Sequence, residues 1–173
     1  MHDIWALGCS FTRGTGVAEK DCWVSQLSNL LGKPIENLGI EGAAPKRVWH
    51  RYQELRAEYQ PKLTIIQWPG TVRDTVYLRG QAVNLGLWNV NDYPLYRQQL
   101  VSGQTERQNQ QLIARAKTII TELAIHFDVR SIFYPFQDLA EDHVHPGVKT
   151  HEQIALWVKQ QLDSKGPAAV STD

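Results

Sequence analysis

Residues 7–14 read LGCSFTRG and directly follow a short apolar run, Ile4-Trp5-Ala6-Leu7. A strand that stops at Gly-x-Ser and turns at once holds its serine on a tight strand-to-helix turn. The glycines permit the sharp bend, and the backbone N–H groups of such a turn can stabilise an oxyanion while a serine hydroxyl attacks an acyl carbon. The stretch therefore predicts the end of a buried strand, with Ser10 as a candidate nucleophile.

Apolar strand-like runs alternate with helical patterns along most of the chain. Strands are expected at about 4–7, 35–38, 63–68 and 129–134, and helices at about 21–31, 45–60, 105–126 and 149–162. This alternation is typical of a parallel sheet that is covered by helices on both faces. We therefore expect a three-layer α/β/α sandwich with a parallel sheet of about four to five strands and flavodoxin-like winding.

The length of 173 residues fits one domain, which we expect to span residues 1–164. Residues 71–103 interrupt the α/β pattern because Trp, Tyr and Arg are interleaved there with Gly and Pro, and no helical period is visible. A small hairpin at 76–78 and 82–85 is expected within this aromatic-rich insertion, which should overhang the site. Residues 165–173 are rich in small residues and Pro, which predicts a flexible tail.

The charge balance and the cysteine content exclude several classes of partner. Lys and Arg total 18, as do Asp and Glu, so there is no electrostatic case for nucleic acid or an anionic membrane. The two cysteines make no metal-ligand pattern, and no metal or organic cofactor is implied. No signal-peptide pattern and no apolar run of about 18 residues is present, which predicts a cytoplasmic protein.

A candidate base lies near the other end of the chain, where residues 142–147 read DHVHPG. Asp142 is three residues before His145, so its carboxylate can reach the imidazole ring, fix the tautomer and favour the protonated form. An imidazole is well suited to take a proton from a serine near neutral pH. His143 is a competing base. Cys9 is a competing nucleophile, but it is adjacent to Ser10 on a bend, so the two side chains are expected to point apart.

The carboxyl ends of parallel strands share one edge of a sheet, where ligands bind. Ser10, Gly42 and Gly70 each follow an expected strand, and His145 lies in the loop after the last one. We therefore expect these four residues to converge on one edge.

Three sequence blocks resemble those of the SGNH hydrolase superfamily, also called the GDSL lipase/esterase-like family. Residues 8–14 match its Gly-Asp-Ser-x-Thr-x-Gly block, with Cys9 in place of Asp. Asn37 and Gly42 match the second block, and residues 142–146 match its Asp-x-x-His-Pro block. The matches span most of the chain, in the order and spacing of a small member of that family.

The resemblance implies a role for each matched residue. Ser10 falls on the nucleophile, His145 on the base, and Asp142 on the residue that orients the base. The backbone N–H groups of Ser10 and Gly42 fall on oxyanion donors.

The third block of the family is absent. Members carry Gly-x-Asn-Asp after the central strand, and this Asn donates to the oxyanion, whereas residues 67–73 here read QWPGTVR. Thr71 stands at the Asn position, and its hydroxyl is the candidate third oxyanion donor, although it is shorter and less firmly aimed than an Asn amide. Loss of one such donor costs about a hundredfold or more in rate. Three roles are open for Arg73: it substitutes for the missing donor, it binds an acidic group of the substrate, or it is a solvated loop charge.

Aromatic residues with polar neighbours suit sugar rings better than lipid chains. Trp68, Arg73 and Tyr77 are therefore expected to bind substrate, while Trp88 is expected to pack inside the insertion. These expectations favour an esterase that removes small acyl groups, acetyl foremost, from a carbohydrate or similar polar ester. Two alternatives remain open: an acyltransferase with the same triad, and a non-catalytic carbohydrate-binding or assembly module on the same fold.

Overall fold

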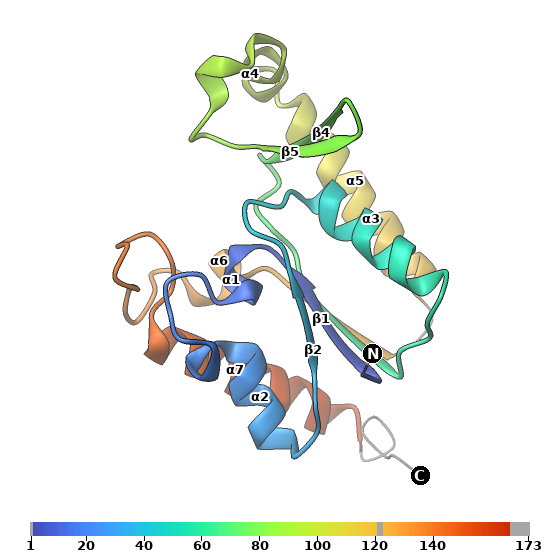
Figure 1. Cartoon of the computed structure of the whole chain (residues 1–173), viewed down its shortest axis with the longest axis vertical. Coiled ribbons are helices and arrows are strands. Elements are labelled where there is room, and N and C mark those ends of the chain that lie inside the picture. The colour runs from blue at the N-terminus through green and yellow to red at the C-terminus, as the bar shows by residue number, and fades with distance from the viewer. Residues whose placement is uncertain (1, 121–122, 167–173) are drawn as a thin grey trace.

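The computed structural model describes residues 2–120 and 123–166, and a four-stranded parallel sheet lies at its centre (Figure 1). The strands are β1 (Ile4–Gly8), β2 (Glu36–Gly39), β3 (Leu63–Gln67) and β6 (Leu123–Phe127), in the order β2-β1-β3-β6. All residues of β1 and β3 are buried, as central parallel strands require. The predicted parallel sheet and its flavodoxin-like winding are confirmed, with four strands.

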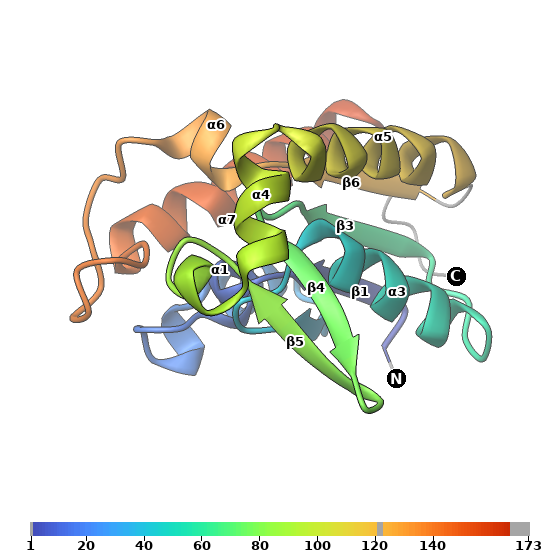
Figure 2. The same ribbon diagram turned by 90° about the horizontal axis from the view of Figure 1, so that it is seen from above.

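Helices cover both faces of the sheet (Figures 1 and 2). On one face α2 (Trp23–Leu31) packs against α7 (Val148–Ser164), and on the other α3 (Pro45–Arg56) packs against α5 (Gln104–Ile119). The short helices α1 (Ser10–Arg13), η1 (Glu19–Asp21) and α6 (Val129–Phe133) lie in the connections. The three-layer architecture is therefore confirmed.

The aromatic-rich insertion forms a small unit that projects from one end of the domain (Figure 1). Strands β4 (Asp74–Leu78) and β5 (Gln81–Leu85) pair as the predicted hairpin, followed by η2 (Val90–Asp92) and α4 (Pro94–Val101). The expectation of no helix here was wrong, because Pro94 starts α4, a position that suits proline. The buried Tyr96 anchors α4 by donating a hydrogen bond from its hydroxyl to the Val72 carbonyl at 2.6 Å.

The boundaries predicted for the third quarter of the chain were also wrong. The helix expected at 105–126 ends at Ile119, and Leu123–Phe127 instead form β6, which pairs along its length with β3. The strand expected at 129–134 is the short helix α6, because Asp128 accepts a hydrogen bond from the backbone N–H of Arg130 and caps it. Most of the tail expected at 165–173 lies outside the described residues.

Both cysteines, Cys9 and Cys22, are buried and free. None of the helices within residues 2–120 and 123–166 combines the length and the apolar character needed to cross a membrane. The same residues contain no group of three or more His, Cys, Asp or Glu side chains that could hold a metal ion.

Candidate active site

The turn that carries Ser10 is held by a buried side chain at the end of β3, that of Gln67. Gln67 Oε1 accepts hydrogen bonds from the backbone N–H and the thiol of Cys9, both at 3.2 Å, and from the Thr12 hydroxyl at 3.3 Å. Its Nε2 donates to the Trp68 carbonyl at 2.8 Å. Gly8 leaves room for this packing, because a Cβ there would lie 2.1 Å from Thr12 Oγ1. Gln67 therefore fixes the strand-to-helix turn on which Ser10 sits.

Ser10 lines a cavity of about 370 Å³ at this edge of the domain. The other lining residues come from four separate segments: Glu41, Gly42, Arg73, Asn84, Trp88, Val144 and His145. The structure thus brings Ser10, Gly42 and His145 together, although they are far apart in the sequence. Within residues 2–120 and 123–166 the Ser10 hydroxyl makes no hydrogen bond, and none joins it to His145.

Asp142 and His145 form a tight pair in the loop that precedes α7. Asp142 Oδ2 lies 2.5 Å from His145 Nδ1, and Oδ1 accepts hydrogen bonds from the backbone N–H groups of Val144 and His145, both at 2.9 Å. The N–H groups of His145 and Val144, together with the His145 side chain, lower the pKa of Asp142 to about 2. The carboxylate is therefore ionised near neutral pH and can accept a hydrogen bond from Nδ1–H of the imidazole. The Phe11 ring meets the His145 ring edge-on, with centroids 5.7 Å apart.

Asp138 anchors this loop to the start of α7. Its carboxylate accepts hydrogen bonds from the backbone N–H groups of Lys149 at 2.9 Å and Thr150 at 2.8 Å. Burial raises the pKa of Asp138, but these hydrogen bonds outweigh burial, and the pKa is lowered overall. His143, the competing base, has a φ of +56° and does not line the Ser10 cavity.

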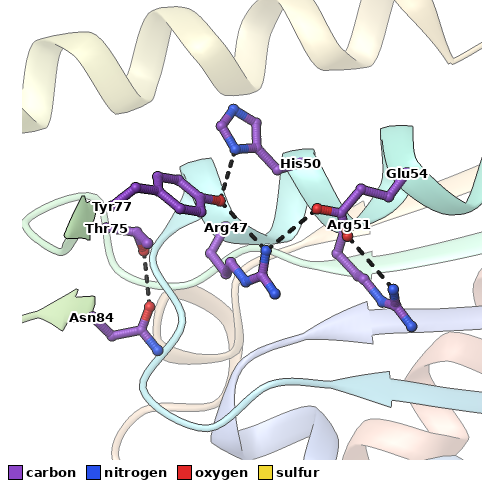
Figure 3. A network of polar contacts seen from close by, with 7 residues as sticks. All are labelled: Arg47, His50, Arg51, Glu54, Thr75, Tyr77 and Asn84. Atoms are coloured by element: carbon purple, nitrogen blue, oxygen red, sulfur yellow. Dashed lines mark hydrogen bonds and ion pairs between the residues drawn. The ribbon is translucent and has the colours of Figure 1, made fainter. Parts of the chain in front are cut away.

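Gly42 reaches the cavity from the turn after β2, where its φ is +67°. Asn84 on β5 ties the turn down by donating a hydrogen bond to the Glu41 carbonyl at 2.9 Å, while its Oδ1 accepts from the Thr75 hydroxyl at 2.9 Å (Figure 3). In the described part of the chain, the N–H groups of Ser10 and Gly42 donate no backbone hydrogen bond. Among the described residues, these two N–H groups therefore have no backbone acceptor, and both belong to residues that line the cavity.

Thr71 is not among the residues that line the Ser10 cavity. It lines a neighbouring cavity of about 390 Å³, and its carbonyl accepts a hydrogen bond from Asn109 Nδ2 at 2.8 Å. Arg73 lines both cavities. Of the two residues expected to replace the missing Asn, the structure brings only Arg73 to Ser10.

Trp68 and Tyr77 were expected to bind substrate, and neither lines the cavity. Trp68 is 3% exposed because it packs into the core, stacks on the His126 ring and donates a hydrogen bond from Nε1 to His126 Nδ1 at 3.2 Å. Tyr77 points toward α3, where its hydroxyl lies 2.9 Å from His50 Nδ1 and accepts from Arg47 at 3.4 Å (Figure 3). Tyr77 joins the hairpin to the domain rather than facing the site.

Glu41 and Asn84 line the Ser10 cavity although neither was expected there, and Trp88 was expected to pack inside the insertion. Trp88 is 56% exposed and lines both cavities, with the Arg73 guanidinium carbon 5.1 Å from the centroid of its ring. The sequence feature that could have indicated this position is Gly86, two residues before Trp88. A Cβ on Gly86 would lie 2.0 Å from the Trp88 ring, so the glycine lets the ring fold back on its own turn.

No family model and no curated protein matches this chain at a significant level. Several solved structures do match this chain. The crystal structure of TesA matches with a TM-score of 0.58 and 16% identity, over 93% of this chain and 98% of that one. A member of the lipolytic protein G-D-S-L family from Veillonella parvula matches with a TM-score of 0.52 and 14% identity, over 91% and 96%.

A carbohydrate esterase family 2 enzyme with a carbohydrate binding domain, from Corynascus thermopiles, is also similar. It matches with a TM-score of 0.52 and 14% identity, over 91% of this chain and 64% of that one. At these identities the likeness is one of fold. The chain has the fold of the SGNH, or GDSL, hydrolases.

Proposed function

We propose that this protein is a serine esterase that removes small acyl groups, acetyl foremost, from a carbohydrate or similar polar substrate. The observation that carries the proposal is that Ser10 and His145 line one cavity, while Asp142 contacts Nδ1 of the His145 ring. The fold supports it as well, because the similar structures include lipolytic proteins and a carbohydrate esterase.

In the proposed reaction each of these side chains has one role. Ser10 Oγ attacks the acyl carbon while the imidazole of His145 takes its proton, and Asp142 holds Nδ1–H and stabilises the imidazolium. The N–H groups of Ser10 and Gly42 bind the oxyanion of the tetrahedral intermediate. The alcohol then leaves with the proton from His145, and an acyl-enzyme remains. Water, activated by the same base, releases the acid and restores Ser10.

The side chains that line the cavity and its volume support a small, polar substrate. Its lining combines the exposed ring of Trp88 with the polar side chains of Glu41 and Asn84, and such a mixture suits a sugar ring. The volume of about 370 Å³ accommodates a small acyl ester.

The proposal is tested by measuring acetate release from acetylated oligosaccharides and from 4-nitrophenyl acetate. Ser10→Ala and His145→Ala should each lose at least about a thousandfold in rate, because nucleophile and base act as a unit. Ser164→Ala, on an exposed residue at the end of α7, and His143→Asn are matched controls that should keep the native rate. Native-like hydrolysis by Ser10→Ala would refute the proposal. Acetyl transfer to an added alcohol in place of acetate release would indicate the acyltransferase.

A further inference from the structure

The cavity beside the Ser10 cavity carries two arginine side chains. The two cavities share Arg73, Trp88 and Val144, so one ligand can extend from Ser10 into the neighbouring space. The neighbouring cavity has a volume of about 390 Å³ and is also lined by Asp128 and Arg130.

Arg73 is oriented by an aromatic ring, and one of its guanidinium nitrogens has no acceptor in the described part of the chain. Its guanidinium lies over the Trp88 ring, and its Nη1 is buried without a hydrogen-bond partner among residues 2–120 and 123–166. Buried donors in folded proteins are nearly always satisfied, and a guanidinium N–H is a strong one. The planar fork of arginine matches the two oxygens of a carboxylate. An acceptor brought by a ligand would therefore complete this site.

Arg130 adds a second positive charge on the same side. Its guanidinium carbon lies 5.9 Å from the centroid of the Phe11 ring. The only acidic residue in the described lining of this cavity is Asp128, and its Oδ1 already accepts the backbone N–H of Arg130 at 3.0 Å. Two guanidinium groups thus face this cavity against one carboxylate that caps α6.

We propose that the neighbouring cavity is a subsite for a carboxylate, so that the preferred substrates are esters that also carry an acid group, such as an acylated sugar acid. Arg73 is the main ligand of that carboxylate, and Arg130 adds to the attraction. The inference rests on the proposed esterase function, because it concerns the substrate of the same site.

The test compares esters of equal shape and different charge. The 3- and 4-acetoxybenzoates are paired with the corresponding acetoxybenzamides, and kcat/KM is measured for each. At least one benzoate should be preferred over its amide by about tenfold or more in the native protein, since a charge-assisted hydrogen bond has that effect. Arg73→Gln should reduce this preference about tenfold or more, and Arg130→Gln by a smaller factor. Arg97→Gln removes the same charge from an exposed position outside both cavities and should leave the preference unchanged.

Several outcomes would overturn the subsite. One is equal kcat/KM for all benzoates and their amides in the native protein, and another is a preference that Arg73→Gln leaves intact. An equal loss for both esters in Arg73→Gln would assign Arg73 to the oxyanion instead.

A binding measurement keeps this inference separate from the proposed function. If the native protein cleaves none of the esters, the esterase proposal fails, and calorimetry with the stable analogues 3- and 4-acetamidobenzoate then decides on the subsite. Binding at least tenfold tighter than that of the matching acetamidobenzamide, weakened by Arg73→Gln, supports the subsite. Equal binding of acid and amide contradicts it.

Discussion

His151 should make this protein lose stability in mild acid. The side chain lies on α7, fully buried, and its Nδ1 accepts a hydrogen bond from the backbone N–H of Trp23 at 3.1 Å, at the start of α2. Only a ring without a proton on Nδ1 can accept this bond. Burial lowers the pKa of His151 to about 4, the Asp138 carboxylate partly opposes this shift, and His145 lowers the pKa further.

The size of the effect follows from linkage. The unfolded chain has an ordinary histidine pKa of 6.5, so between pH 6.5 and 4 it binds more protons than the folded chain. Stability therefore falls as the pH falls through this window, by up to about 1.4 kcal/mol per pH unit. Between pH 7 and 5 the His151 contribution amounts to about 2 kcal/mol, which in a domain of this size shifts Tm by roughly 4–8 °C.

The assay compares denaturant unfolding of native protein and His151→Asn at pH 7 and pH 5. Asn Oδ1 can accept the bond from Trp23 but does not titrate, so the native protein should lose about 2 kcal/mol more than the variant between the two pH values. His143→Asn is the control, since His143 has a positive φ that Asn tolerates, and its losses should equal those of the native protein. Parallel pH profiles of native protein and His151→Asn would refute the reasoning.

Two further substitutions test how the site is held. Asp142→Asn removes the charge beside His145 Nδ1 and should lower kcat by about a thousandfold or more, with little change in KM, as measured with 4-nitrophenyl acetate; an unchanged kcat would rule out an orienting role. Gln67→Leu leaves buried donors of the nucleophile turn without an acceptor and should cost about 3 kcal/mol in guanidinium unfolding, and a cost below about 0.5 kcal/mol would contradict the role given to Gln67.

The local patterns in the sequence were sufficient to predict the three layers of the fold. Strands β1 and β3 are short and buried on both faces, and glycine-containing turns follow β1 and β2. Strand β6 was misplaced because LAIHF continues the amphipathic pattern of α5, and only its pairing with β3 separates the two elements. Helix α4 was not predicted because two of its apolar residues, Leu95 and Val101, are exposed, so its apolar residues do not mark one buried face.

Only part of the site could be predicted, because the rest depends on tertiary contacts that no local pattern reveals. Ser10, Gly42 and His145 were expected at one edge because each follows a strand or lies in the last loop, and all three line one cavity. Asn84 reaches it only because the hairpin docks on the Glu41 carbonyl. Trp68 resembled a site residue by its place after β3, but alternation along the chain turns its ring into the core.

The proposed function requires that Ser10 is a nucleophile activated by His145. An alkyl fluorophosphonate, with mass spectrometry to locate its adduct, can detect this activated serine. One covalent adduct is expected, on Ser10, and it should disappear in Ser10→Ala and form much more slowly in His145→Ala. An unlabelled Ser10 in folded native protein, or an adduct on Cys9 instead, would contradict it.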